Sequence, residues 1–347
     1  MREQTGEETR KIQFTGKSTY IVSLPKKWVT SLGLKAGSQV VITQQNNSLI
    51  LTPKEMARPS AQPVEAVLAI SSKDDPETIS RAIVSLYLAG YSFIVVRAKE
   101  GRIGTTQINV VKELTRKKLV GTEIISETPN EIRLQTLASY PEIPVENALR
   151  RMCIIATSMH SDAVQALKNL DKKLAQDVIQ LDDEVDRFSI YLVRQLKAAV
   201  QNEKILREVG LSSPRDCLGY RVIVKSVERI SDHAVRIAEN VLSMEEKPSP
   251  AVFERIHEMS TLAQNVFEDA IKSLFKKDYT LADQVVSRAK AMVALENEAV
   301  KEIQSKAKQV NISSIRMIME SIRRTAEYAS DIAEIVLNLN IDRMISK

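Results

Sequence analysis

The chain has 347 residues, a net charge of +5 and 27% charged residues, with ten glycines, eleven prolines and two cysteines. This length favours two or three domains. No run approaches the ~18–20 consecutive apolar residues of a membrane span, and the polar N-terminus does not resemble a signal peptide. Cys153 and Cys217 stand alone in helical patterns. We therefore expect a cytoplasmic protein with no membrane insertion, no disulfide framework and no zinc site of the cysteine–histidine type.

Glycine, proline and charge are unevenly distributed along the chain. Eight of the ten glycines and eight of the eleven prolines lie within residues 1–144. Because helix interiors exclude both residue types, the remainder is expected to form long helices. Residues 1–60 contain nine basic and four acidic residues, whereas the rest contains 40 of each. The positive charge therefore belongs to the first 60 residues, where it can attract nucleic acid or an acidic partner.

The first 56 residues predict a small β-rich module. The expected elements are strands at 10–15 and 20–24, a helix from Pro25 to Leu32, and strands at 40–43 and 49–52. Gly33 is the expected left-handed stop of the helix, and Asn46-Asn47 suits a hairpin turn. A module of this size cannot bury its many apolar side chains within one chain. We therefore expect them to be buried in a dimer.

The run from Gly16 to Val40 resembles the AbrB/SpoVT/MazE group of swapped-hairpin DNA-binding domains. The shared features are the glycine–basic start, the hydrophobic–proline step, the short helix and the Leu-Gly-Leu sequence before the last hairpin. The resemblance implies an interleaved homodimer with a basic face for DNA. The candidate DNA-contacting residues, chosen for charge as much as for alignment, are Arg10, Lys11, Lys17, Lys26 and Lys27.

One substitution weakens the case for sequence-specific recognition. Where the family has Gly-Arg this chain has Gly16-Lys17, and lysine is a poorer bidentate reader of bases than arginine. Contacts to phosphate would give salt-sensitive binding with little sequence selectivity. The alternative is that the module only dimerises and does not bind DNA.

Residues 64–140, after a proline-bearing linker at 57–63, predict a small α/β sandwich of order βαβαββ. The expected elements are a strand at 64–70, a helix from Asp75-Pro76 to Leu88 that Gly90 ends, a strand at 93–96, a helix at 105–118, and strands at 122–125 and 131–134. The sequence from Gly101 to Gly104 is too short for a phosphate-binding loop. No residues that point to chemistry are found here. A ligand-sensing role and a packing role are both open, and packing is favoured.

Beyond residue 144, apolar residues recur at alternating intervals of three and four, which is typical of packed helices. Five breaks divide this region into six helices, four of them long. Residues 227–239 match 322–334 at an offset of 95, and 171–178 match 278–285 at an offset of 107. The repeat predicts two tandem three-helix bundles, at 145–247 and 250–345. The whole chain is therefore predicted to be a multidomain α+β protein.

A duplicated three-helix bundle whose last helix carries Glu-Arg-Ile-x-Asp-His-Ala-x-x-Ile-Ala-Glu resembles the PhoU family of phosphate-uptake regulators. The motif spans 228–239 here and recurs, diverged, near 323–334. The resemblance implies a non-enzymatic regulator of phosphate homeostasis with a phosphate transporter or signalling protein as partner. It also implies metal clusters bound through Glu/Asp-x-x-x-Asp motifs, with iron, zinc or another divalent or trivalent cation.

Two such motifs lie in the first bundle, and their residues are Asp182, Asp186, Glu228 and Asp232. Each motif places two carboxylates one turn apart on one helix face. If the two helices are neighbours, the four carboxylates converge, and their repulsion raises one or more pKa values unless a cation is bound. The alternative is a solvated acidic face with Arg187 and Arg229 as counter-charges. His233 lies ~100° around the helix from Asp232, so we expect it beside the site or at the surface.

The second repeat has lost most of these carboxylates, because Ala289, Val293, Arg323 and Glu327 stand at the corresponding positions. A second metal cluster is therefore not expected. Three functional hypotheses follow: a DNA-binding transcriptional regulator with a sensing body, an oligomeric adaptor of a phosphate transporter without DNA binding, and a metal-binding helical bundle. No nucleophile–base pair or phosphate loop points to an enzyme.

Overall fold

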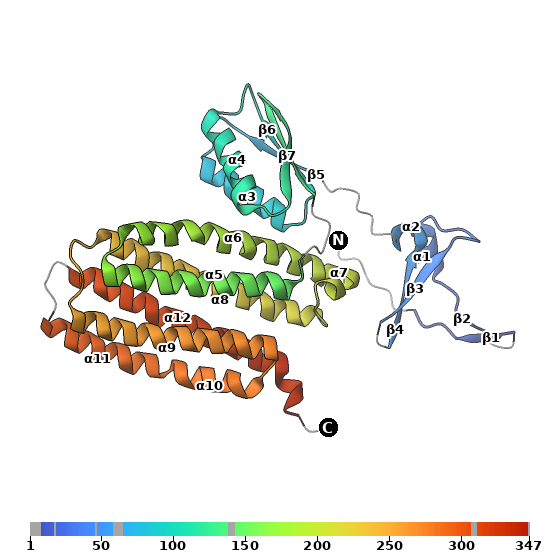
Figure 1. The fold of residues 1–347 in the computed structure, drawn as a ribbon. Coiled ribbons are helices and arrows are strands. Elements are labelled where there is room, and N and C mark those ends of the chain that lie inside the picture. The colour runs from blue at the N-terminus through green and yellow to red at the C-terminus, as the bar shows by residue number, and fades with distance from the viewer. Residues whose placement is uncertain are drawn as a thin grey trace. The chain divides into compact units, whose positions relative to one another are not determined.

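The computed structural model describes residues 8–16, 19–45, 47–57, 65–137, 143–306 and 311–345. The chain divides into two units, Met1–Gln62 and Pro63–Lys347 (Figure 1). The first unit, called the head below, is the predicted β-rich module. The second unit contains a small sheet domain and a helical body. Most of the predicted linker at 57–63 lies outside the described residues.

The head consists of two hairpins and a short helix between them. Its elements are β1 (Gln13–Thr15), β2 (Thr19–Ile21), α1 (Lys26–Ser31), β3 (Val40–Gln45), β4 (Ser48–Pro53) and α2 (Lys54–Ala57). Strands β1 and β2 pair antiparallel, as do β3 and β4, in two separate two-stranded sheets. Gly33 follows α1 with a φ of +65°, as its predicted role requires. The predicted strands and helix are confirmed.

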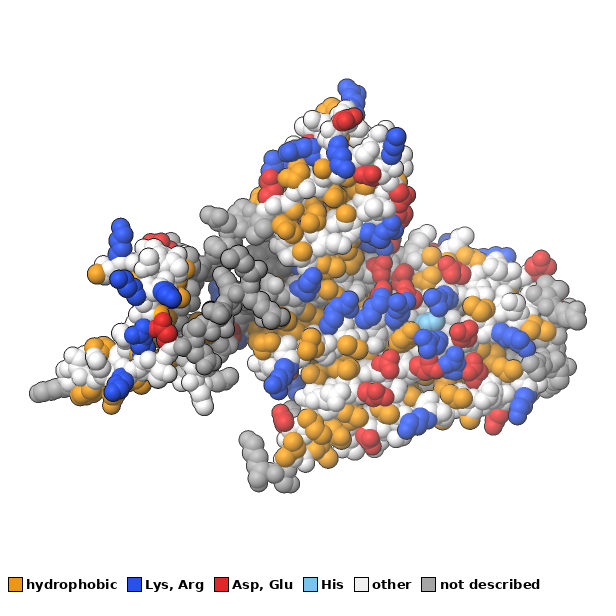
Figure 2. All heavy atoms as spheres, turned by 180° about the vertical axis from the view of Figure 1, so that it is seen from behind, with side chains coloured by type: hydrophobic (Ala, Val, Ile, Leu, Met, Phe, Trp, Pro, Cys, Tyr) orange, Lys and Arg blue, Asp and Glu red, His pale blue; other side chains and the backbone are white. Residues whose placement is uncertain are grey.

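The head has almost no interior within a single chain. Nine large apolar side chains are exposed in it, namely Ile12, Phe14, Tyr20, Ile21, Val22, Val41, Ile42, Leu49 and Ile50. Two of them, Ile12 and Tyr20, are 72% exposed. Figure 2 shows such apolar side chains at the surface of the head beside lysine and arginine. Exposed apolar patches of this kind are typical of surfaces that contact another molecule.

The sheet domain has the predicted βαβαββ order. Its elements are β5 (Glu65–Ile70), α3 (Pro76–Leu88), β6 (Phe93–Ala98), α4 (Thr105–Lys118), β7 (Thr122–Thr128) and β8 (Glu131–Thr136). The sheet order is β5-β6-β8-β7, with β5 parallel to β6 and the other pairs antiparallel. Asp75 caps α3 by accepting the backbone N–H of Thr78 at 3.0 Å. Helices α3 and α4 cover one face of the sheet (Figure 1).

The helical body contains eight described helices where six were predicted. They are α5 (Val145–Asn169), α6 (Lys172–Gln201), α7 (Glu203–Glu208), α8 (Pro214–Ser243), α9 (Pro250–Lys276), α10 (Tyr279–Ala289), α11 (Ala291–Lys306) and α12 (Ile312–Asn340), followed by a 3-10 turn at Ile341–Arg343. The breaks predicted near residues 170–171, 209–214, 247–250 and 277–278 are confirmed. The fifth, predicted at 310–311, lies partly outside the described residues. The count was wrong because Asn202 caps a new helix, α7, by accepting the N–H of Lys204 at 2.9 Å. A further break at Lys290 involves neither glycine nor proline.

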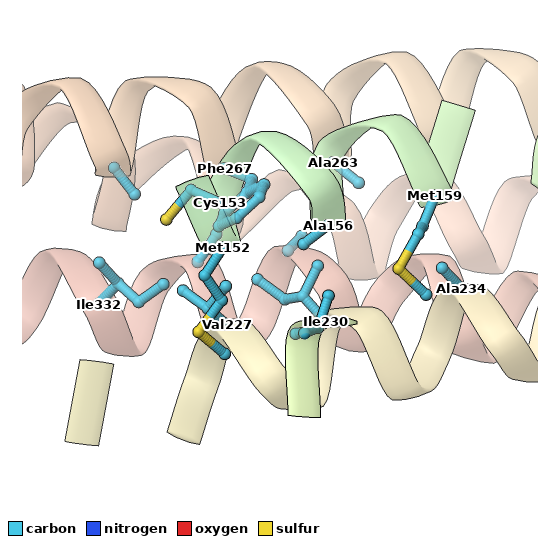
Figure 3. Close-up of a cluster of buried hydrophobic side chains, with 14 of the residues drawn as sticks. Met152, Cys153, Ala156, Met159, Val227, Ile230, Ala234, Ala263, Phe267 and Ile332 are labelled. Atoms are coloured by element: carbon cyan, nitrogen blue, oxygen red, sulfur yellow. The ribbon is translucent and has the colours of Figure 1, made fainter. Parts of the chain in front are cut away.

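The two bundles share one apolar core rather than two separate ones. In Figure 3, side chains from α5, α8, α9 and α12 meet in a single cluster. Met152 of α5, Ile230 of α8 and Ile332 of α12 are fully buried in it. Helices α8 and α12, which carry the corresponding motifs of the two repeats, pack extensively against each other. Burial of one continuous core therefore joins the repeats into one body.

The sheet domain packs on α6 of this body. Ile190 of α6 contacts the apolar core of the sheet domain. Arg194, one turn further along, is only 5% exposed. Its guanidinium donates hydrogen bonds to the backbone carbonyls of Tyr87, Gly90 and Tyr91 at the end of α3. In the part of the chain that the structure describes, no helix is long and apolar enough to cross a membrane.

Candidate functional site

The four predicted carboxylates lie on neighbouring helices, Asp182 and Asp186 on α6 and Glu228 and Asp232 on α8. Burial, and then the carboxylates of Asp186 and Asp232, raise the pKa of Asp182 to about 6, against the opposing effects of Ser231 and Lys118. Burial and the Glu228 carboxylate likewise raise the pKa of Asp232. The structure thus brings the carboxylates into one electrostatically coupled group, called the acidic face below.

The acidic face is partly neutralised by basic side chains. Lys118, at the end of α4, lies 2.8 Å from the Oδ2 atom of Asp186. Lys225 pairs with Glu228, and Arg229 lies 3.4 Å from Asp232. Arg187, the other expected counter-charge, instead pairs with Glu184 at 3.6 Å. The acidic face is therefore neither freely solvated nor fully compensated.

One carboxylate oxygen on this face is buried without a partner. The Oδ1 atom of Asp182 has no hydrogen-bond partner among the described residues. A buried carboxylate oxygen left without a donor is costly, and a bound cation removes that cost. However, no group of three or more His, Cys, Asp and Glu side chains in the described ranges is arranged to hold a metal ion. The carboxylates have the chemistry that hard cations prefer, but those in the described ranges are not arranged as a set of metal ligands.

A groove of about 640 Å³ opens between the sheet domain and the helical body at the acidic face. Lys117 and Lys118 line it from α4, and Asp183, Asp186 and Glu228 line it from the body. Lys117 lies 3.5 Å from Asp183. These lysines were not predicted as site residues, although the basic run 116–118 in the last turn of α4 was a visible signal. Their pairing with residues far along the chain needed the tertiary structure.

In the second repeat, an arginine stands where the first repeat has Glu228. Arg323 of α12 pairs with Glu296 at 2.8 Å and also with Glu327. Glu327 pairs in addition with Arg324 at 2.6 Å. The cation that balances these carboxylates is therefore part of the chain itself.

His233 is not at the surface, and that part of the expectation was wrong. It is 4% exposed, because α12 packs against this side of α8. Its ring centroid lies 5.8 Å from that of Tyr328 on α12. Burial, and then the charges of Arg236, Arg324 and Arg229, lower the pKa of His233 to about 4, while Glu327 acts in the opposite direction. The imidazole is therefore neutral at physiological pH.

The candidate DNA-contacting residues of the head are at its surface. Lys11, Lys26 and Lys27 are exposed, and the last two open helix α1. Arg10 is also exposed and pairs with Glu8. Lys17 lies outside the described residues. Contact of these side chains with DNA remains a prediction.

Both regions that carried a resemblance match known families. The PhoU domain family matches residues 149–241 and 256–336, which together make half of the chain. The chain belongs to the PhoU family. Members of this family are regulatory or accessory proteins and not enzymes. The family of antidote-toxin recognition MazE, a bacterial antitoxin, matches residues 13–59 of the head. Both predicted resemblances are confirmed.

Curated PhoU relatives match the helical body at low identity. The phosphate-specific transport system accessory protein PhoU homologue of Aquifex aeolicus is 26% identical over 146 residues, which cover 41% of this chain and 62% of the relative. The chain thus spans less than two thirds of that relative. The homologue of Pseudomonas aeruginosa is 24% identical over 185 residues, which cover 52% of this chain and 75% of the relative.

Two solved PhoU structures share the fold of the helical body. The phosphate transport system regulatory protein PhoU of Streptococcus pneumoniae aligns with a TM-score of 0.50 at 20% identity and covers 58% of this chain and 96% of its own. PhoU of Pseudomonas aeruginosa aligns with a TM-score of 0.52 at 23% identity and covers 57% of this chain and 96% of its own. The predicted arrangement of helical bundles in this PhoU-family protein is thereby confirmed.

Proposed function

We propose that this PhoU-family protein is a DNA-binding regulator of phosphate uptake and phosphate homeostasis. The phosphate-related part rests on its relatives, which are named as accessory or regulatory proteins of phosphate transport. The DNA-binding part rests on the head, which matches the MazE family and carries the local excess of positive charge. In this proposal the helical body contacts a phosphate transporter or signalling protein, and the head couples that contact to DNA.

The observation that carries the proposal is the open apolar surface of the head. Two hairpins with unpaired edges and nine exposed apolar side chains do not make a stable domain alone. Pairing of two heads in a homodimer would bury these side chains and would place two copies of the basic residues on one assembly. Doubling the phosphate contacts strengthens binding to a duplex and steepens its salt dependence.

Replacement of Lys26 and Lys27 by glutamate should weaken binding to duplex DNA about tenfold or more. It should also lower the slope of log affinity against log salt by about one for each phosphate that the variant no longer neutralises. Fluorescence anisotropy of the full chain with a labelled duplex, over a series of salt concentrations, measures both effects. The matched control is Lys172→Glu with Lys173→Glu, which reverses two adjacent exposed lysines on α6 and should leave the affinity within about twofold.

The oligomeric state of the full chain, measured beside its DNA binding, tests the alternative that the protein is an adaptor that does not bind DNA. Light scattering of the full chain should give a dimer, and deletion of residues 1–56 should give monomers. A dimer that shows no DNA binding even at about 50 mM salt, with wild type and lysine variants alike, would leave the head as a dimerisation element only. In that case the transporter-adaptor function replaces the one proposed.

For the acidic face we propose a cation site for iron, zinc or another divalent or trivalent ion. Its support is the buried, unpartnered Oδ1 atom of Asp182 beside three further carboxylates. Carboxylate oxygens are suited to hard cations. Asp182, Asp186, Glu228 and Asp232 would hold the ion, which would relieve the mutual repulsion of these groups.

Lys118 occupies this face from the sheet domain, so lysine and metal ion should compete for Asp186. Lys118→Gln should therefore raise the bound metal content severalfold, and Asp182→Asn or Asp232→Asn should lower it to background. Elemental analysis of the purified chains measures the content. Lys112→Gln is the matched control, because Lys112 lies on the same helix and pairs with Glu127 at 2.8 Å. Metal content that is unchanged in Asp182→Asn and Asp232→Asn would remove the proposed site.

A further inference from the structure

A second polar pocket lies between α8 and α12. On α12 it is lined by the part of the second repeat in which the carboxylates of the acidic face have been replaced. It has a volume of about 420 Å³. Its walls carry Arg229, His233 and Arg236 from α8, and Arg323, Arg324 and Tyr328 from α12. Figure 2 shows lysine and arginine side chains gathered in the middle of one face of the helical body, with acidic side chains among them.

The internal repeat relates the two walls of this pocket. At the offset of 95 residues, Arg229 corresponds to Arg324, and His233 corresponds to Tyr328. The rings of His233 and Tyr328 lie 5.8 Å apart, centroid to centroid. The two repeats therefore contribute an equivalent guanidinium and an equivalent ring that carries a hydrogen-bonding group. The packing of α8 against α12 places the two sets in one pocket, to which Arg236 and Arg323 are added.

The pocket contains a buried polar atom without a partner. His233 is 4% exposed, and its Nδ1 atom has no hydrogen-bond partner within the part of the chain that the structure describes. A neutral imidazole carries one N–H group, which can donate to a bound oxygen. The Tyr328 hydroxyl accepts a hydrogen bond from Arg324 at 3.2 Å, and its own hydrogen is free to turn toward a ligand.

Acidic side chains beside the pocket pair with three of its four arginines. Glu327 pairs with Arg323 and Arg324, Arg323 also pairs with Glu296, and Asp232 lies 3.4 Å from Arg229. Glu320 also lines the wall. Arg236 is exposed and has no ion-pair partner among the described residues, so an incoming anion can meet its guanidinium without displacing a carboxylate.

We infer that this pocket is an anion site that binds a phosphoryl group, either as free orthophosphate or as the phosphate of a nucleotide. Guanidinium groups present several N–H donors in a plane, which matches the oxygens of a phosphoryl group. The Nδ1 atom of His233 and the Tyr328 hydroxyl supply two more polar contacts on the same ligand. The inference goes beyond the proposed function and does not depend on DNA binding or on a metal at the acidic face.

Calorimetric titration of the full chain tests the site, with orthophosphate and ADP as separate probes. Both Arg236→Gln and Arg324→Gln should weaken binding about tenfold. Arg236 is exposed, so its replacement should not impair folding. Arg221→Gln is the matched control, because Arg221 is exposed on α8 about 22 Å along the helix from Arg236. The nitrogen resonances of the His233 ring should shift on saturation with the probe.

Each outcome decides the inference. Binding that is weakened in Arg236→Gln but not in Arg221→Gln supports it, and the tighter of the two probes identifies the source of the phosphoryl group. Absence of saturable binding of both probes up to about 10 mM, or equal weakening in the Arg221→Gln control, overturns it. Binding of an acidic peptide in the absence of binding to either phosphate probe also overturns it.

Discussion

Arg194→Ala should destabilise the attachment of the sheet domain to the helical body by about 2–4 kcal/mol. Arg194 is 5% exposed, and its guanidinium donates to carbonyl oxygens at 3.3 Å on Gly90 and 3.2 Å on Tyr91, as well as to that of Tyr87. It also lies 4.5 Å above the Tyr87 ring. Alanine removes these donors, so the carbonyl groups of Gly90 and Tyr91 lose the Arg194 hydrogen bonds and that of Tyr87 keeps the N–H of Gly90.

Limited proteolysis and thermal unfolding measure this effect. The sheet domain should become cleavable at protease concentrations that leave wild type intact, and the first unfolding transition should occur at lower temperature. Arg194→Lys should be intermediate, because lysine keeps the charge but not the planar set of donors. Lys197→Ala is the control on an exposed position of the same helix. If Arg194→Ala unfolds like this control, Arg194 does not hold the two parts together.

The second large effect is a loss of stability in acid, which His160 should cause. His160 is 1% exposed at the contact of α5 with α9, and its Nε2 atom lies 3.0 Å from the Ser260 hydroxyl. Burial lowers its pKa from 6.5 to about 4. The unfolded chain therefore takes up a proton between these values while the folded chain does not. Stability is complete above pH 6.5 and falls as the pH approaches 4, by roughly 3 kcal/mol from this residue.

Urea unfolding at neutral pH and near pH 4.5 should reveal this dependence. In His160→Gln, where a neutral amide replaces the imidazole, the loss of stability on acidification should be smaller than in wild type by about 2 kcal/mol. The exposed His257, replaced in the same way, provides the control. An identical loss in wild type and in His160→Gln would show that His160 does not limit acid stability. Comparing variants at both pH values removes the contributions of the other titrating groups.

Local features of the sequence were sufficient for most helix and strand positions. Asp75-Pro76 starts α3 because the aspartate caps it and proline fits its first turn. The alternation of three and four between apolar residues predicted α8 and α12, because this spacing puts them on one face of a helix. The extra break at Asn202 was missed, although asparagine is a common cap. Nothing local marked the break at Lys290, where the backbone angles remain helical.

Spacing within single helices was enough to predict which carboxylates lie on the acidic face. The motif spacing placed Asp182 and Asp186 on one helix face and Glu228 and Asp232 on another, because residues four apart share a face. Charge counts along the chain predicted the basic head, and the internal repeat showed which residues stand in place of a second acidic face. Both rest on composition and helical geometry, which are properties of a short stretch of chain.

Which of these groups meet depends on packing between segments that are distant in the chain. Lys118 and Asp186 are 68 residues apart, and they form a hydrogen bond because the sheet domain packs on α6. His233 is buried because α12, about 95 residues away, packs against α8. Contacts of this kind depend on how apolar faces fit together across the whole chain. The acidic face could therefore be predicted from the spacing along two helices, whereas the arginine pocket between α8 and α12 emerged only from their packing.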